Sequence, residues 1–304
     1  MEYQIIRFTK ENIDFFQKLF FAVYNKKLNK YEIEHKYEGT SNLSYLGYFA
    51  CIDHQPIAFY GAIPMVSEIN GEIKLSVQST DAMTLPAYRS LGIFYELGKA
   101  VYKTCKECGA DFAWAFTNQN SEKASLKHGI LRYSHRMIRY EWILIKGFME
   151  YLVKVRSLLF SNHLKHFSHH LDSISEFPFG SFIKQNTILH DRAYWDKKKQ
   201  KGAFSVKFGN TIFIIKPSFI LLIGDVWTND TNSFEKDLDA FLNHCKKGHY
   251  VKVVFQSSSG SSLSKLLEKS AHSIHSSWAI LINPFNIDFN LDTFKVTLMD
   301  IDSV

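Results

Sequence analysis

The stretch Thr84-Leu85-Pro86-Ala87-Tyr88-Arg89-Ser90-Leu91-Gly92-Ile93-Phe94 says most about the fold of this chain. It follows an apolar run that predicts a strand, and residues 93–108 keep the apolar spacing of a helix. The backbone N–H groups of a first helical turn have no partner within the helix, and the helix dipole is positive there. Gly92 lets the backbone approach a ligand closely, and Arg89 supplies positive charge. The stretch therefore predicts a helix start that can bind a phosphate-type anion.

A second stretch agrees with the first. Asn118-Gln119-Asn120-Ser121-Glu122-Lys123-Ala124-Ser125-Leu126-Lys127-His128-Gly129-Ile130 follows a buried run at 111–116 and predicts a short helix that Gly129 ends. Together the two stretches resemble the signature of the GNAT superfamily of acyltransferases. That signature is Arg-x-x-Gly opening a helix after a strand, then Asn-x-x-Ala-x-x-Leu-Tyr-x-x-x-Gly-Phe. The second pattern falls here on Asn118, Ser121, Ala124, Ser125, Gly129 and Ile130.

The elements predicted for residues 1–146 follow the order found in GNAT proteins, β-α-α-β-β-β-α-β-α-β-β. Asn70-Gly71 between two apolar runs predicts a tight hairpin. The strand-helix-strand unit from 77 to 116 predicts a right-handed parallel crossover. We expect an α/β (α+β) fold, a GNAT domain with a mixed, splayed central sheet. The predicted strands are 4–8, 43–52, 57–69, 72–85, 111–116 and two within 132–145, and the predicted helices are one after Thr9, then 29–37, 93–108 and 121–128.

The resemblance also implies a cosubstrate, acyl-CoA, and no tightly bound cofactor. Backbone groups at the strand end would hold the pantetheine arm, the helix start would hold the pyrophosphate, and the second stretch would line the wedge between two splayed strands. Phe94 departs from the family, where Gly or Ala is usual at this position. The residues implied in coenzyme binding are Met83, Thr84, Leu85, Arg89, Ser90, Leu91, Gly92, Ile93, Phe94, Asn118, Ser121 and Ser125.

Three residues are catalytic candidates. An acceptor amine must lose a proton before it attacks a thioester. Asp81, on the fourth strand, is a base if it faces the wedge; a carboxylate tied to backbone amides or to the acceptor is an equal alternative. His35 is either a second base or a surface helix residue. Ser125 stands where many relatives carry the Tyr that protonates the departing thiolate, and serine reaches the sulfur only through a closer thioester or a water.

Residues 147–180 predict a helical connector. The segment from Phe148 to Leu171 is amphipathic, and a turn-rich stretch follows it. Four histidines recur there at near-helical spacing, but no carboxylate or cysteine completes a zinc set, so we expect no metal. They are His163, His166, His169 and His170.

Residues 181–304 repeat part of the first order, β-β-β-α-β-α-β-β. Gly224-Asp225 takes the place of Thr80-Asp81, yet the residues after Trp227 contain no Arg-x-x-Gly. We expect a degenerate GNAT-like domain that binds no coenzyme and shapes the acceptor site. Its predicted strands lie near 204–208, 211–216, 219–227, 250–255, 277–283 and 294–300, and its helices near 191–199, 233–247 and 262–271.

The composition sets wider limits. The chain has 304 residues, 46% of them hydrophobic, and a net charge of +6. That charge steers anionic ligands but is not concentrated as nucleic-acid binding requires, so we expect no nucleic-acid partner. Four cysteines form no disulfide framework, the N-terminus has no signal-peptide layout, and no apolar run reaches about 18 residues. We expect a cytoplasmic protein without a membrane partner.

These patterns predict transfer of an acyl group from acyl-CoA to the amine of a small molecule. The whole chain is similar to GNAT enzymes that N-acylate nucleotide-linked amino sugars (dTDP- or UDP-sugars) for bacterial surface polysaccharides, and 15% aromatic residues suit a nucleotide. A tandem-GNAT aminoacyl transferase of the cell-wall-peptide type is one alternative. A non-catalytic acyl-CoA-binding module, suggested by Ser125, is another. The acyl chain, the amine and the oligomeric state are left open.

Overall fold

The computed structural model describes residues 2–38, 43–147, 186–216, 220–260, 262–288, 290 and 293–300. Contacts divide the chain into two compact units. Unit 1 is Met1–Ser67, Glu72–Ser134 and Ala279–Leu291, and unit 2 is Glu68–Gly71, His135–Trp278 and Asp292–Val304. The predicted helix from Phe148 to Leu171, with its four histidines, lies outside the described residues.

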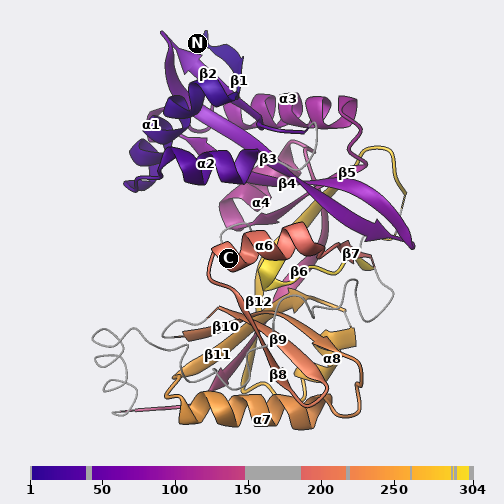
Figure 1. Cartoon of the computed structure of the whole chain (residues 1–304). Coiled ribbons are helices and arrows are strands. Elements are labelled where there is room, and N and C mark those ends of the chain that lie inside the picture. The colour runs from indigo at the N-terminus through magenta and orange to yellow at the C-terminus, as the bar shows by residue number, and fades with distance from the viewer. Residues whose placement is uncertain are drawn as a thin grey trace. The chain divides into compact units, whose positions relative to one another are not determined.

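Unit 1 has the predicted order of elements from β1 to α4 (Figure 1). Its strands follow one another in the sheet as β1-β2-β3-β4-β5-β12. The pairs β1–β2 and β2–β3 are antiparallel, whereas β4 and β5 are parallel, as the crossover prediction requires. The elements are β1 Gln4–Arg7, α1 Ile13–Tyr24, α2 Lys30–Tyr37, β2 Leu46–Ile52, β3 Gln55–Ile69, β4 Glu72–Thr84, α3 Ile93–Glu107, β5 Phe112–Thr117, α4 Gln119–Lys127 and the end of β12, Ser273–Pro284.

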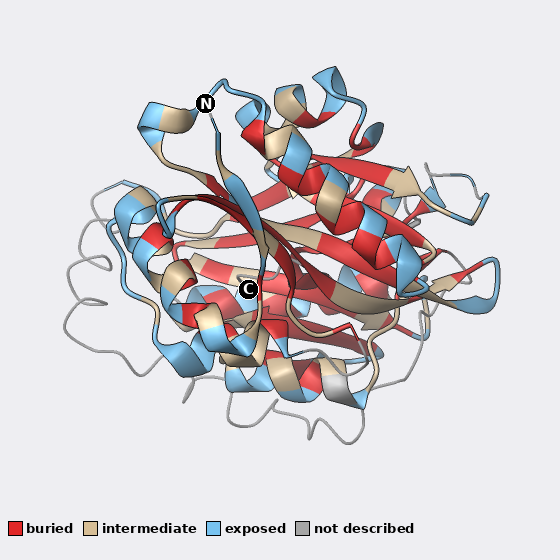
Figure 2. Cartoon of the chain, turned by 90° about the horizontal axis from the view of Figure 1, so that it is seen from above, coloured by how far each residue is buried: buried red, intermediate tan, exposed pale blue. Residues whose placement is uncertain are grey.

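Helices cover both faces of this sheet, as the alternation of buried side chains along β2 and β3 shows. Ala50 and Tyr60 belong to one buried cluster together with Leu97 of α3. Their neighbours Phe49 and Phe59 belong to another cluster, which contains the buried residues of α1 and α2. Successive strand residues point to opposite faces, so α3 lies on one face and α1 with α2 on the other. Figure 2 shows these helices buried on the side toward the strands and exposed on the outside.

Unit 2 repeats the order of unit 1. Its strands follow one another as β12-β6-β11-β10-β9-β8. The pair β10–β11 is parallel, like β4–β5, and β11 pairs antiparallel with β6. The second prediction of a GNAT-like order is therefore confirmed at the level of fold. The elements are β6 Arg132–Ile143, β7 Thr187–Ile188, α6 Arg192–Gln200, β8 Phe204–Phe208, β9 Thr211–Lys216, β10 Ile220–Thr228, α7 Phe234–Lys247, β11 Lys252–Ser258, α8 Ser262–Leu267 and the start of β12.

Two predicted strand assignments were wrong. Residues 132–145, predicted as two strands, form the single strand β6, because seven of its residues pair in unbroken register with β11. Residues 294–300, predicted as a strand, contain two isolated bridges, at Lys295 and Thr297, followed by a 3-10 turn at Leu298–Asp300. Asp300 accepts the backbone N–H of Thr297 at 2.7 Å, and this local bond favours a turn over an extended strand.

The sequence did not predict which strand lies on the other side of β5. The end of β12 pairs antiparallel with β5, from Ala279 opposite Thr117 to Pro284 opposite Phe112. In unit 1 the antiparallel neighbour of β5 is thus β12, through its residues 279–284. In unit 2 the antiparallel neighbour of β11 is β6.

Candidate functional site

The parallel strands β4 and β5 part from each other in the middle of unit 1. Their register ends at the pair Gln78–Trp114, although β4 continues to Thr84 and β5 to Thr117. Beyond that pair, no β4–β5 pairing is present among the described residues. This opening lies where the sequence predicts the wedge for a pantetheine arm.

A change of backbone conformation at Asp81 turns its side chain to one face of the sheet. Asp81 has a φ of 52° inside a strand, which is uncommon for a residue with a side chain. Residues two apart in a regular strand share a face. Here, however, the hydroxyl of Ser79 contacts Tyr102 of α3 at 2.5 Å, whereas Asp81 contacts α2. The positive φ at Asp81 therefore accompanies a carboxylate that lies on the side of α1 and α2.

Two consecutive residues of α2 hold one oxygen of that carboxylate. The Tyr37 hydroxyl donates to Asp81 Oδ2 at 2.6 Å, and Lys36 Nζ lies 2.6 Å from the same atom. Within the described part of the chain, Oδ1 has no protein partner, and the Asp81 side chain is 16% exposed. The carboxylate is thus fixed by one oxygen and presents the other. The sequence singled out the adjacent His35, whose ring stacks on Tyr31 at 5.8 Å instead.

The start of α3 has the form of an anion site. Ser90 and Gly92 have φ values of 64° and 79°, and Gly92 is the N-cap. The N–H groups of Tyr95 and Glu96 bond to the Gly92 carbonyl. Across the ranges that the structure describes, no protein group accepts the preceding N–H groups, those of residues 90–94. Arg89 is exposed, and its Nε donates to the Thr84 carbonyl at 3.2 Å.

This loop and Asp81 lie within electrostatic reach of one residue, Tyr24 at the end of α1. Burial and the Asp81 carboxylate raise the pKa of Tyr24, while Lys36 and Arg89 act in the opposite direction. The predicted pyrophosphate end and the predicted chemical end of the site are therefore near each other in unit 1.

The remaining predicted residues fall into three groups. Phe94 packs on Tyr60 with ring centroids 5.1 Å apart, so its side chain enters the core and leaves its backbone at the loop. The N–H of Leu85 donates to the Ile57 carbonyl at 2.9 Å and is not available to a ligand. Met83 is buried and Thr84 is partly exposed on the same strand end.

The second predicted stretch forms the start of α4. Asn118 is its N-cap and accepts the N–H groups of Asn120 and Ser121 at 3.0 and 3.1 Å. The Ser121 hydroxyl donates back to the Asn118 carbonyl at 3.2 Å. Ser125 is only 1% exposed. Asn118 therefore ends β5 and begins α4, which is why an Asn is suited to the point where the strand leaves the wedge.

Unit 2 contains a second splayed pair, and its gap is filled. The register of β10 and β11 ends at Ile223–Phe255, although both strands continue. The segment from Phe294 to Asp300 occupies the space: the N–H of Ser258 donates to the Val296 carbonyl at 2.9 Å, and the N–H of Val296 donates to Ser258 Oγ at 3.2 Å. A Cβ on Gly224 would collide with the fully buried Met299. The chain itself closes this wedge.

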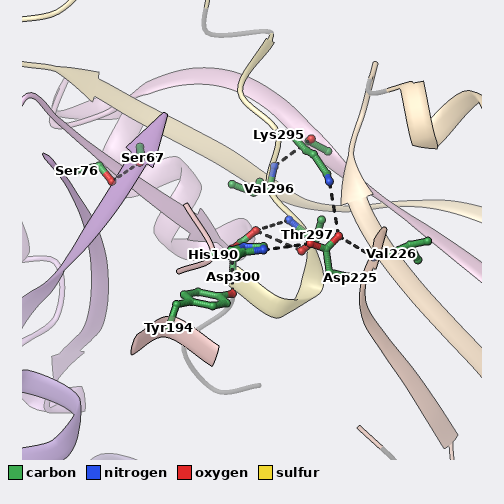
Figure 3. Close-up of polar contacts among 11 residues, drawn as sticks. Ser67, Ser76, His190, Tyr194, Asp225, Val226, Lys295, Val296, Thr297 and Asp300 are labelled. Carbon is green, nitrogen blue, oxygen red and sulfur yellow. Dashed lines mark hydrogen bonds and ion pairs between the residues drawn. The ribbon is translucent and has the colours of Figure 1, made fainter. Parts of the chain in front are cut away.

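Buried charges fasten the closing segment (Figure 3). His190 Nε2 lies 2.7 Å from Asp300 Oδ1, and His190 Nδ1 lies 3.2 Å from Asp225 Oδ2. Lys295 lies 3.6 Å from Asp225, and the Tyr194 hydroxyl donates to Asp300 at 3.1 Å. Burial alone would lower the pKa of His190, but the two carboxylates raise it to about 9. Asp225, predicted to replace Asp81, is therefore part of a structural ion cluster.

The helix after β10 also differs from α3 in charge. Its first turn carries Glu235 and Asp237, and the loop before it carries Asp230. Asp237 accepts the N–H of Asn210 and the hydroxyl of Thr211, both at 2.9 Å. Carboxylates at a helix start repel a pyrophosphate, so the start of α7 does not repeat the features of the α3 start that favour an anion.

Two further properties of the described residues bear on function. No helix in them is both long and apolar enough to cross a membrane. Nor do they hold a group of three or more His, Cys, Asp or Glu side chains that could bind a metal ion.

Comparison with solved structures gives the fold. No protein-family model matches the sequence, and no curated protein matches it. A GCN5-related N-acetyltransferase from Kribbella flavida superposes with a TM-score of 0.61 at 9% identity, over 94% of this chain and 72% of its own. A conserved protein of unknown function from Enterococcus faecalis V583, a probable N-acyltransferase, gives 0.64 at 12% identity over 94% and 73%. A putative acetyltransferase from Pyrococcus horikoshii gives 0.54 at 12% identity over 96% and 92%.

Proposed function

We propose that this chain, which has the GNAT fold over nearly its whole length, is an acyl-CoA-dependent N-acyltransferase with one coenzyme site, in unit 1. The observation that carries the proposal is the contrast between the two splayed strand pairs. In unit 1 the pair β4–β5 is open and the N–H groups of residues 90–94 have no protein acceptor among the described residues. In unit 2 the corresponding gap holds residues 294–300 and the helix start is acidic.

Coenzyme binding would use the start of α3. The diphosphate would accept N–H groups of residues 90–94, and Arg89 would offset its charge. The pantetheine arm would lie along β4 and bond to Met83 and Thr84, since the N–H of Leu85 is already bonded to Ile57. The amides of Met83 and Thr84 would also polarise the thioester carbonyl.

The transfer step needs a base for the acceptor amine and a leaving group that can depart as a thiolate. Asp81 Oδ1 would take a proton from the acceptor's ammonium, directly or through water, and the amine nitrogen would then attack the thioester carbon. As the C–N bond forms, the C–S bond breaks and CoA leaves as a thiolate. Ser125 would protonate that thiolate through a water or not at all, because a thiolate is a fair leaving group near neutral pH.

The acceptor we propose is the amine of a nucleotide-linked amino sugar. Such a substrate carries an anionic nucleotide diphosphate, which a chain of net charge +6 attracts. The high aromatic content of the chain suits the nucleotide base. In this proposal residues 1–146 bind acyl-CoA, 147–180 connect, and 181–304 shape the acceptor site. The closed wedge of unit 2 supports the last role, because it leaves that part of the chain no room for a coenzyme arm.

The buried position of Ser125 favours one other candidate, a non-catalytic acyl-CoA-binding module. A thiol-release assay separates the candidates: an acyl-CoA panel is tested against nucleotide-linked amino sugars, simple amines and aminoacyl-tRNA, with Arg89→Ala as the matched control. We expect release that depends on a nucleotide amino sugar and falls in the variant. Coenzyme binding without release with any acceptor would support the module, and release only with aminoacyl-tRNA would support the cell-wall-peptide class.

A further inference from the structure

The amine closest to the proposed base belongs to the protein. A general base must lie within about 2.6–3.2 Å of the atom whose proton it takes. Lys36 Nζ, a primary ammonium, meets this condition at 2.6 Å from Asp81 Oδ2. An amine acceptor would have to reach the same carboxylate. Lys36 is therefore a primary amine located where an acceptor amine would have to bind.

The surroundings of Lys36 hold its backbone and leave its side chain room to move. The next residue, Tyr37, is 1% exposed and packs edge-on against Phe8, with ring centroids 5.0 Å apart. The Lys36 side chain is 19% exposed, and its Nζ lies 5.6 Å from the centre of the Tyr37 ring. A lysine carries its ammonium on a flexible four-carbon stem. To reach the adjoining strand end, Met83 and Thr84, Nζ has to move away from Asp81 by rotation of this stem.

We infer that Lys36 is an acyl acceptor, so that this chain acylates its own Lys36 from acyl-CoA when no other amine is present. This inference rests on the proposed function, because it needs the thioester bound along β4. The Lys36 ammonium gives one proton to Asp81, and the neutral Nζ attacks the thioester carbon. The new C–N bond replaces the C–S bond, CoA leaves as a thiolate, and the proton on the nitrogen after attack passes to that thiolate.

Acylation would change the site as well as mark it. An amide nitrogen carries no charge, so the modified Lys36 would no longer pair with Asp81. Tyr37 would remain as the donor to Oδ2. The Asp81 carboxylate would then meet an incoming ammonium without competition from Lys36.

The test uses the full-length protein and acetyl-CoA, with no acceptor added. Peptide mass mapping over time follows acetyl groups on individual lysines. Lys18 serves as the internal reference, because its side chain is 61% exposed and pairs with Asp14 on the surface of α1. Unspecific acetylation follows exposure and labels Lys18 before Lys36. Two variants accompany the wild type: Lys36→Arg, which retains the positive charge opposite Asp81, and Asp81→Asn, which removes the base.

We expect Lys36 to gain one acetyl group at least about tenfold faster than Lys18, and Asp81→Asn to slow this by about 100-fold, the usual contribution of a general base. Labelling in proportion to exposure, or equal rates in Asp81→Asn, would overturn the inference. Calorimetry with CoA and thiol release with added amines are run on the same protein. If CoA binds and an added amine is acylated while Lys36 stays unmodified, the inference fails and the proposed function stands. If CoA does not bind, the proposed function fails.

Discussion

Replacing His190 by Gln should remove a large, pH-dependent part of the stability of unit 2. His190 is enclosed by Asp225 and Asp300, and its pKa is about 9 against an ordinary value of 6.5. Because the pKa is raised in the folded state, the stabilisation is fully present below pH 6.5 and is lost as pH rises through 9. The difference of roughly 2.5 units, at about 1.4 kcal/mol each, gives between about 3 and 4 kcal/mol well below pH 6.5, and about 3 kcal/mol at pH 6.5, where the unfolded histidine is half protonated. In His190→Gln, Asp225 keeps its ion pair with Lys295 at 3.6 Å.

The assay is urea unfolding at pH 6.5, 8 and 9.5, followed by hydrogen exchange in β10 and β11 so that unit 2 is observed directly. The wild type should lose about 3 kcal/mol across this range, and His190→Gln should be less stable at pH 6.5 and lack that loss. His275→Gln, at an exposed position of β12, is the matched control and should behave as the wild type. A His190→Gln protein that keeps the wild-type pH dependence would refute the reasoning, because the loss would then arise elsewhere.

Three further predictions concern unit 1. The double variant Arg89→Ala, Gly92→Val should raise the CoA dissociation constant at least about tenfold, or about 1.4 kcal/mol. Arginine supplies positive charge there, and valine does not readily adopt the φ of 79° found at Gly92. Unchanged CoA affinity by calorimetry in a folded variant would show that CoA does not bind at this helix start. Ser125→Ala should lower turnover by less than about 20-fold, against about 100-fold for a true general acid, and a larger loss with intact CoA binding would assign Ser125 that role. Tyr37→Phe keeps the ring but removes its hydrogen bond to Asp81 Oδ2, which retains only the ion pair with Lys36 among the described contacts, so kcat should fall by about tenfold at unchanged CoA affinity; equal kcat would show that the hydroxyl does not position the base.

Local patterns predicted most elements of both units. The apolar spacing of residues 93–108 and the Asn70-Gly71 turn depend on neighbours in sequence, and both are present, with φ values of 55° and 81° at the turn. The failures involve distant partners. Residues 294–300 fill the gap beside β11 instead of forming a strand, because Val296 bonds to Ser258 and Asp300 pairs with His190. No local pattern predicts these pairings.

The site shows the same limit. The wedge and the helix start follow from motifs, and the structure has both features. The partners of Asp81 could not be predicted, because Tyr37 lies 44 positions away and the contact depends on a φ of 52° at Asp81. Helical spacing placed His35, Lys36 and Tyr37 on one short helix without indicating which of them faces β4. The residue roles themselves stay predictions.

The position of β12 has a consequence for how the protein is made. Thr117 of β5 bonds to Ala279, 162 residues later, so the sheet of unit 1 is incomplete until nearly all of the chain has left the ribosome. During that interval the edge of β5 offers unpaired backbone groups to any extended segment, including β12 of another copy. Pairing across so long a separation is slow. Newly made chains should therefore depend on chaperones more than their length suggests, and concentrated refolding should yield dimers that exchange β12, whereas dilute refolding should not.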